Sequence, residues 1–423
     1  MSTAMSSLTN SLGCQAAALR IGVLDRLAQR LALAQLARWR AAVTIELPNG
    51  RAIDLVPSRA RRSVTVTVRN PRVFRRLLAS GDIGLGESYM DDDWACSDLV
   101  ELCRLFVVES PALQSWLTLP MRAVHAWQRI ARANSLRGSR RNIRAHYDLS
   151  NDLFRLFLDP SMTYSAGVFA HPDATLEEAQ HAKLDGICRS LALQPGDHVL
   201  EIGSGWGSFA IHAARSYGCR VTSLTLSQDQ LTLARQRVAE AGLSERVDIQ
   251  WCDYRHATGQ YDHVVSIEMF EAVGLRYYDA FFGACERLLR PHGRMFLQTI
   301  AIPDQRFRAY ARDFDWSRKY IFPGSLLASL HEITASLRRV TRLRIESLRD
   351  IGLDYARTLH CWRERFLRAQ HDVRRLGFDD RFIRMWDFYL ASCAASFAAR
   401  YINDLQLVLR RPLPFARALA AGG

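Results

Sequence analysis

The sequence has no long hydrophobic run, no closely paired cysteines and almost no lysine. No stretch approaches the roughly 18 consecutive apolar residues of a membrane-spanning helix, and residues 1–15 lack the basic start and apolar core of a signal peptide. The nine cysteines include no Cys-x-x-Cys pair and no metal-ligand spacing with histidine. We therefore expect no metal site, free thiols in a reducing cytoplasm, and a protein that is soluble or attached only at a membrane surface.

Lysine occurs only at Lys183 and Lys319, so arginine carries nearly all of the positive charge behind a formal net charge of +13. Such an excess attracts polyanions, and composition alone does not choose between nucleic acid and an anionic lipid leaflet. Arginines are frequent in residues 129–144. This basic stretch is either a solvated linker or a segment that contacts phosphates near a membrane surface.

At 423 residues and 48% hydrophobic composition, the chain is large enough for two packed cores. We predict a small N-terminal α+β domain at 1–115, a basic linker at 116–143 and a larger domain at 144–412. In the first domain the expected elements are an amphipathic helix within 1–45, alternating strands at 43–47 and 64–68 around a turn at 48–50, a helix at 71–78 and a turn-rich break at 81–86.

From about residue 195, the pattern changes to strands that alternate with helices. The expected strands lie at 198–203, 220–226, 247–251, 261–267 and 294–300, with helices at 206–217 and 228–241 after the first two. This alternation predicts an α/β fold built on a doubly wound, Rossmann-like parallel sheet. Helical insertions are expected at 303–340 and 355–402, and a late edge strand near 405–409.

A glycine-rich turn, Leu200-Glu-Ile-Gly-Ser-Gly-Trp-Gly207, joins the first of these strands to the first helix. Gly203 and Gly205 allow the backbone to turn tightly and to approach a ligand closely. Ser208 stands where a dinucleotide-binding turn has its third glycine, and Thr225-Leu-Ser227 follows the second strand where an NAD site needs an acid. The turn instead resembles motif I of S-adenosylmethionine methyltransferases, although glycine-rich turns also occur without a ligand.

In that motif Glu201 would lie at the edge of the cofactor pocket, which fits the rule that ligands bind at the carboxyl ends of such strands. Asp253 ends the third strand, where residues of this superfamily commonly read the adenine amine; taken alone it is a loop acid. Enzymes that methylate base amino groups carry an Asn/Asp-Pro-Pro-aromatic signature after the fourth strand. Ile267-Glu-Met-Phe-Glu271 stands there and contains no proline, so no nucleic-acid substrate is expected.

Several segments together resemble cyclopropane-fatty-acyl-phospholipid synthases and mycolic-acid cyclopropane synthases. The matching segments are 144–154, 159–165, 176–183, 224–230, 270–274 and 320–324. Their order and spacing are specific to this family, and the likeness extends over about 140–410, which is then the methyltransferase domain. Residues 75–94 also resemble the N-terminal domain of the bacterial phospholipid-acting enzymes, which favours a phospholipid substrate.

The resemblance implies S-adenosylmethionine as the cofactor and assigns its contacts. The implied cofactor residues are Tyr164, Ser165, Gly203, Gly205, Thr225, Leu226 and Gln230. Glu271 and Tyr355 match the residues that hold a bicarbonate ion beside the substrate double bond. Taken alone, a carboxylate at Glu271 after an apolar strand could instead cap a helix N-terminus, and Tyr355 would be interpreted as a buried tyrosine.

The implied reaction places an acyl-chain alkene in line with the sulfonium methyl in a dry site. Methyl transfer leaves a carbocation, which an aromatic face stabilises and from which a base removes a proton. Phe270, Tyr320, Tyr355 and Trp362 are the aromatic candidates. We expect a cyclopropane product first, a methyl- or methylene-branched chain as the alternative, and a non-catalytic lipid-binding relative as an alternative of another class.

Three positions depart from the family pattern. Ala166 replaces a cysteine, Ala272 replaces a histidine, and Gln298 replaces a histidine that is a bicarbonate ligand. Glutamine still donates and accepts hydrogen bonds but does not titrate near neutral pH. The bicarbonate site is therefore altered at Ala166 and Gln298, and Gln298 joins Glu271 and Tyr355 as a candidate catalytic residue. We further expect a peripheral location at the inner membrane surface, and the resemblance is compatible with a homodimer.

Overall fold

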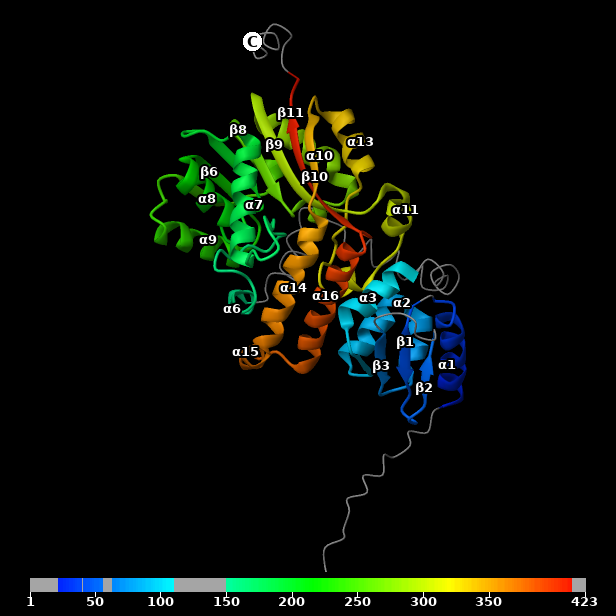
Figure 1. The fold of residues 1–423 in the computed structure, drawn as a ribbon. Helices are drawn as coiled ribbons and strands as arrows, with labels where there is room; N and C mark the ends of the chain where they lie inside the picture. The colour runs from blue at the N-terminus through cyan, green and yellow to red at the C-terminus, as the bar shows by residue number, and fades with distance from the viewer. Residues whose placement is uncertain (1–21, 40, 56–62, 110–149, 413–423) are drawn as a thin grey trace, which may run out of the picture.

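The computed structural model describes residues 22–39, 41–55, 63–109 and 150–412, and these residues form two sheets joined by long helices (Figure 1). A four-stranded sheet lies in the N-terminal unit, and a seven-stranded sheet lies in the C-terminal unit. The predicted basic linker falls outside the described residues, as do the two boundaries drawn at 115 and 143. Within the described ranges, no helix is both long enough and apolar enough to cross a bilayer.

The N-terminal unit packs helices against a sheet of strand order β2-β1-β3-β4. Its elements are α1 (Val23–Leu36), β1 (Val43–Glu46), β2 (Ala52–Asp54), β3 (Val64–Val68), α2 (Arg72–Met90), β4 (Trp94–Cys96) and α3 (Leu99–Glu109). The turn at 48–50 joins β1 to β2, and β1 pairs with β3 in parallel. The sequence prediction missed β2 because this strand has only three residues and shows no buried alternation.

The predicted break at 81–86 is confirmed at its first residue only: α2 consists of two helical segments separated by a kink at Gly81, and the second segment runs on to Met90. Gly81 alone leaves the helical region, with φ 55° and ψ −126°, and the helix resumes after this kink. Gly86 lies inside the helix, where an added Cβ would collide with the side chains of Trp316 and Phe388. The glycines that suggested a turn therefore include one that permits close packing against the C-terminal unit.

The large sheet has the strand order β10-β11-β9-β8-β5-β6-β7, with β11 antiparallel to both of its neighbours. Its strands are β5 (His198–Ile202), β6 (Arg220–Thr225), β7 (Val247–Trp251), β8 (Tyr261–Ile267), β9 (Leu289–Ala301), β10 (Arg344–Asp350) and β11 (Asn403–Arg410). The parallel strands confirm the predicted doubly wound sheet. The strand near 405–409 is not an edge strand, because β10 pairs on its outer side; the charged, largely exposed sequence of β10 hid this strand from prediction.

Helices cover both faces of the large sheet. The described α-helices of the whole C-terminal unit are α6 (Asn151–Arg155), α7 (Leu176–Leu191), α8 (Ser208–Tyr217), α9 (Gln228–Glu240), α10 (Tyr278–Leu288), α11 (Asp304–Arg312), α12 (Trp316–Tyr320), α13 (Leu330–Val340), α14 (Gly352–Arg368), α15 (Gln370–Arg375) and α16 (Asp380–Ala398). Alternate strand residues point to opposite faces, so one apolar cluster packs with α10 and α13 and another with α7, α8 and α9.

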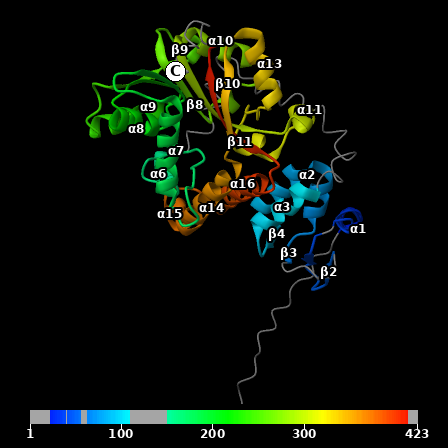
Figure 2. The same ribbon diagram turned by 45° about the horizontal axis from the view of Figure 1, so that its top comes forward.

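The antiparallel helices α14 and α16 lie between the large sheet and the N-terminal unit, as both views show (Figures 1 and 2). α16 packs against α14 on one side and against α2 and α3 on the other. Tyr89 of α2 donates a 2.6 Å hydrogen bond to Asp387, and Arg384 donates a 2.9 Å bond to the carbonyl of Trp94. A single apolar cluster runs from the small sheet into these two helices, so the N-terminal unit is built onto the helices that border the site.

Candidate active site

A cavity opens where the carboxyl ends of β5, β6, β7 and β8 meet at one edge of the large sheet. This is the position at which doubly wound sheets bind ligands. The cavity brings together every residue predicted to contact the cofactor: Tyr164, Ser165, Glu201, Gly203, Gly205, Thr225, Leu226, Gln230 and Asp253. The predicted cofactor residues therefore line a single cavity.

The glycine-rich turn forms the floor of this cavity. Gly203 and Gly205 have φ values of 99° and 49°, which side chains other than glycine rarely adopt. The amides of Gly203 and Ser204 both donate to the carbonyl of Leu224, at 3.0 and 2.9 Å, and tie the turn to the end of β6. An added Cβ on Gly205 would meet no atom within 4 Å. The backbone of the turn is thus held open toward the cavity, as a ligand that approaches closely requires.

One wall of the cavity carries a buried acid and a buried base. Ser223 donates a 2.5 Å hydrogen bond to Glu201 on β5, and burial raises the pKa of Glu201 to about 8. Lys183 of α7 donates a 2.7 Å bond to the hydroxyl of Ser165, and burial lowers the pKa of Lys183 to about 8. A bound cation stabilises a carboxylate in such a place. This wall fits the amino acid part of S-adenosylmethionine, which carries an ammonium and a carboxylate.

Asp253 lies on another wall, after β7, and begins the 3-10 helix Tyr254–His256. Arg255 donates to both carboxylate oxygens of Asp253, at 2.8 and 2.6 Å. Burial alone would raise the pKa of Asp253, but this guanidinium holds it below its ordinary value. Asp253 therefore stays an anionic acceptor, and apolar neighbours such as Leu226 and Met269 give this part of the cavity the character expected of an adenine pocket.

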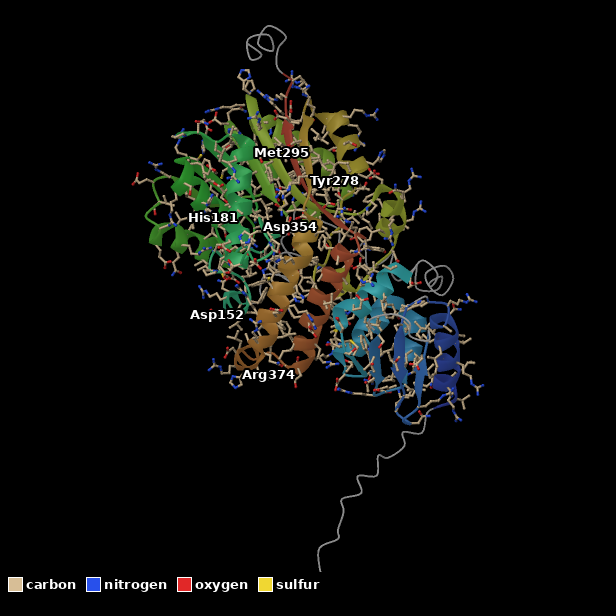
Figure 3. The ribbon with its side chains drawn as sticks, in the orientation of Figure 1. Asp152, His181, Tyr278, Met295, Asp354 and Arg374 are labelled. Carbon is tan, nitrogen blue, oxygen red and sulfur yellow. The ribbon has the colours of Figure 1, made fainter. Side chains whose placement is uncertain are left out.

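The segment that follows Tyr164 is fastened on several sides. The Tyr164 ring stacks on Trp362 at 5.1 Å, and its hydroxyl lies 2.8 Å from that of Tyr389. Farther along, the amide of Phe169 donates a 3.1 Å bond to Asp354, which Figure 3 labels at the end of α14 that faces the sheet. These contacts hold the segment between the cavity and α14.

The candidate catalytic residues Tyr355 and Gln298 meet at a carboxylate that the sequence did not single out, that of Glu268. The Tyr355 hydroxyl donates a 2.6 Å bond to one oxygen of Glu268, and the Gln298 amide donates a 2.7 Å bond to the other. The same Gln298 amide group donates a 2.9 Å bond to Asp404 of β11. Glu268 follows β8 directly and lines the cavity. Its position at the end of a central strand was the one sequence feature from which a role in the site could have been predicted.

Glu271 lies beside this group, and among the described residues its hydrogen bonds go to β9 and not to Tyr355. It lies in the 3-10 helix Phe270–Ala272, and one of its oxygens accepts bonds from the Thr299 hydroxyl at 2.9 Å and from the Ile300 amide. Its other oxygen has no partner among the described residues. Burial, followed by the charge of Glu268, raises the pKa of Glu271 to about 7. Glu271 is therefore a buried acid bound to β9, and not a helix cap.

Three carboxyl groups form one cluster, in which Glu271 and Asp404 are buried and Glu268, at the cavity, is partly buried. Burial is the largest cause that raises the pKa of each, and the charge of Glu268 further raises the pKa values of Glu271 and Asp404. Lys183 is the cation whose charge lowers the pKa values of Glu268 and Asp404. Because like charges in one apolar site do not all ionise, the cluster both accepts and retains protons near neutral pH.

Two of the four aromatic candidates lie near this cluster. The Tyr355 ring stacks on Phe397 at 4.5 Å and meets Trp362 edge-on at 6.1 Å. Phe270, the first residue of the 3-10 helix, is instead packed in the core, and the Tyr320 hydroxyl donates a hydrogen bond to Glu87 of α2. Tyr355 thus borders the cluster directly, whereas Trp362 is fully buried and stacks on Tyr164, and the described cavity is lined by neither ring.

Comparison with known proteins places this arrangement in a family. The family profile described as Mycolic acid cyclopropane synthetase matches residues 134–407. The chain is 43% identical over 368 residues to the tuberculostearic acid methyltransferase of Mycobacterium tuberculosis, with 84% of each chain covered. It is 38% identical over 356 residues to the cyclopropane-fatty-acyl-phospholipid synthase of Escherichia coli (strain K12), with 82% of this chain and 87% of the relative covered.

A solved structure of a mycolic acid cyclopropane synthase complexed with SAH and CTAB superimposes with a TM-score of 0.61 at 33% identity, over 64% of this chain and 98% of that one. The matched region contains the glycine-rich turn, the cavity and the carboxyl cluster. The chain therefore belongs to the mycolic acid cyclopropane synthetase family and is an S-adenosylmethionine-dependent C-methyltransferase that acts on lipid.

Proposed function

We propose that the protein methylates the double bond of an unsaturated phospholipid acyl chain and closes a cyclopropane ring. One observation carries the proposal: the cavity that holds the cofactor motif is lined both by an aromatic ring, that of Tyr164, and by the partly buried carboxylate of Glu268. An alkene needs no activation by a strong base, but the cation that it becomes needs both an electron-rich face and a proton acceptor. The site offers these two groups at the edge of the cofactor pocket.

The cofactor supplies an electrophilic methyl group on a sulfonium. The glycine-rich turn and the segment at Tyr164 line the cavity, and these residues would hold the cofactor and exclude water from its methyl group. The alkene electron pair forms the new carbon–carbon bond, the carbon–sulfur bond breaks, and a positive charge remains on the neighbouring chain carbon. A carboxylate of the site then takes one proton, so the lipid gains a net CH₂ and no oxidant or reductant is needed.

The product depends on when that proton leaves. If it leaves the new methyl group at once, the freed electron pair closes a three-membered ring. If a hydride first moves from the methylated carbon to its neighbour, the same loss gives a methylene branch on an open chain. A base fixed beside the cofactor shortens the life of the cation, and Glu268 lines the cofactor cavity. This placement favours ring closure.

A second candidate is a methyl- or methylene-branched acyl chain. It is favoured by the 43% identity to a protein named tuberculostearic acid methyltransferase and by the replacements at Ala166 and Gln298. Mass spectrometry of lipids from unsaturated phospholipid vesicles, incubated with the protein and methyl-labelled S-adenosylmethionine, separates the two candidates. Ring closure predicts a labelled product heavier by one CH₂ that resists mild hydrogenation, whereas a methylene product of the same mass takes up hydrogen. No labelled lipid at all would overturn the proposal.

We also propose that the protein works at the surface of an anionic membrane, on its inner side. Helix α1 exposes Leu24, Leu27 and Leu31 at 68%, 56% and 52%, with Arg26 and Arg30 exposed between them. An apolar stripe flanked by arginines is the pattern of an interfacial helix, and the net charge of +13 acts in the same direction. Co-sedimentation with anionic vesicles should weaken as salt shortens the screening length from about 10 Å at 0.1 M to about 3 Å at 1 M. Binding that ignores salt, or no binding, would contradict the electrostatic part.

A further inference from the structure

Three hydrogen-bond donors from separate parts of the chain converge on the carboxylate of Glu268. They are the Tyr355 hydroxyl on α14 at 2.6 Å, the Gln298 amide on β9 at 2.7 Å and the backbone amide of Ala166 at 2.8 Å. Positions 355, 298 and 166 are three of the four, with Glu271, that the sequence resemblance connects with a bound bicarbonate. In this chain the same donors hold a side chain.

A carboxylate presents the planar pair of oxygens that bicarbonate presents, and both oxygens of Glu268 are already bonded. A free anion on these donors would face the Glu268 carboxylate at contact distance, in a site where burial already disfavours charge. The residues around Glu268 therefore do not fit bicarbonate as long as this side chain is present. The carboxyl of Asp404, which accepts a hydrogen bond from the same Gln298 amide, adds a second acidic group beside Glu268.

The backbone at Glu268 is strained. Its φ of 47° lies in the left-handed region, which residues other than glycine, asparagine and aspartate seldom adopt. Such strain costs on the order of 1–3 kcal/mol and persists where the surroundings fix it, most often at functional sites. The three donors supply that fixation, and the strained turn aims the carboxylate back across the end of β8 into the cavity.

From this geometry we infer that Glu268 is the built-in general base of the reaction and takes the place of a bicarbonate ion. The inference rests on the proposed function and names the proton acceptor within it. The carboxylate removes the proton from the transferred methyl group, and the C–H electron pair closes the ring. Protonated Glu268 then returns the proton to solvent during turnover, so the cycle needs no diffusible anion.

The replacement of histidine by Gln298 fits this role. An imidazolium beside the carboxylate would lower its basicity, whereas an amide donates a hydrogen bond without titrating. The Gln298 carbonyl accepts a 3.0 Å bond from Gln406, which fixes the amide so that its NH₂ faces Glu268 and Asp404. Gln298 is thus a positioning residue that orients the carboxylate of Glu268 and adds no positive charge beside it.

The test compares the wild-type protein with Glu268→Gly and Glu268→Gln in buffer stripped of carbon dioxide, with added bicarbonate or formate as the probe. Glycine suits the positive φ and empties the donor set, whereas glutamine fills it without a basic oxygen. The wild type should methylate lipid at an unchanged rate without bicarbonate. Glu268→Gly should lose about 10²–10⁴-fold in kcat, the usual contribution of a general base, and recover at least about tenfold with either probe. Glu268→Gln should lose as much and show no recovery.

Binding of ¹³C-labelled bicarbonate, followed by NMR, gives a readout that is independent of turnover. The label should bind Glu268→Gly and not the wild type or Glu268→Gln. A wild type that needs bicarbonate or binds it, or a Glu268→Gly variant with full activity, would overturn the inference. If no variant methylates any lipid while the labelled ion still distinguishes them, the proposed function fails and the assignment of the anion site stands. If Glu268→Gly does not fold, the wild type and Glu268→Gln still decide the question.

Discussion

Replacing Tyr355 by phenylalanine should shift the pH dependence of catalysis toward higher pH. The Tyr355 hydroxyl donates a 2.6 Å bond to Glu268, and among the contacts that lower the pKa of this partly buried carboxyl it is the largest. A hydrogen bond to a charged group contributes about 1.5–3 kcal/mol. Since one pKa unit corresponds to about 1.36 kcal/mol, its loss should raise the pKa of Glu268 by about one to two units.

The base works only when it is deprotonated, so the acid limb of the kcat profile should move to higher pH by the same amount. On that limb the variant should be about 10- to 100-fold slower than the wild type, and the two should converge as the pH rises. The assay is methyl transfer from labelled S-adenosylmethionine to saturating vesicle lipid, measured from about pH 6 to pH 9.

Tyr89→Phe is a matched control, because Tyr89 also donates a 2.6 Å bond to a buried carboxylate, that of Asp387, at the junction with the N-terminal unit. It should lower the melting temperature by a similar amount and leave the pH profile of kcat unchanged. An unshifted acid limb in Tyr355→Phe, with activity otherwise lowered evenly at all pH values, would refute the reasoning and reduce Tyr355 to a packing residue.

Three further predictions concern the cofactor turn, stability and the membrane. Gly203→Ala should weaken S-adenosylmethionine binding by at least about tenfold in calorimetry, because its Cβ would lie 3.0 Å from Met269 at a φ of 99°; Gly196→Ala, at φ 90° with no atom near its Cβ, should not. Burial raises the pKa of Glu201 to about 8, so the folded state binds an extra proton and wild-type stability falls as the pH rises from about 4 to 8. The melting temperature of Glu201→Gln relative to the wild type should therefore increase between pH 5 and pH 8, and a constant difference would contradict the assignment. Leu27→Ser should weaken vesicle co-sedimentation more than Leu376→Ser, a change at another exposed leucine, and equal effects would argue against α1 as the contact surface.

The parts of the fold that follow from local pattern were predictable from the sequence. The strands from β5 to β9 alternate with helices, and the glycine-rich turn between β5 and α8 marks the ligand edge of the sheet by itself. Strand β10 was missed because its residues are mostly charged and exposed, and β11 was placed at the edge as a consequence. Local pattern predicts which segments are strands, but only the pairing reveals their neighbours.

The carboxyl cluster could not be predicted in the same way. Glu268 contacts Ala166, Gln298 and Tyr355, which lie 102, 30 and 87 positions away in the chain. No periodicity links residues at such separations, and a buried acid has no sequence signature apart from its environment. The departures at 166 and 298 did indicate that the anion site was altered, and the structure identifies a third residue around which both changes are arranged.

Helix α16 connects the N-terminal unit to the helix that carries a candidate catalytic residue. One side of this helix packs on α14, which carries Tyr355, and the other side packs on α2 and α3. On this outer side the ring of Phe388 meets the ring of Tyr89 of α2, with their centroids 5.8 Å apart. Removal of the N-terminal unit would therefore expose an apolar side of α16 to water, and a shortened chain would need polar residues on that side to stay in solution.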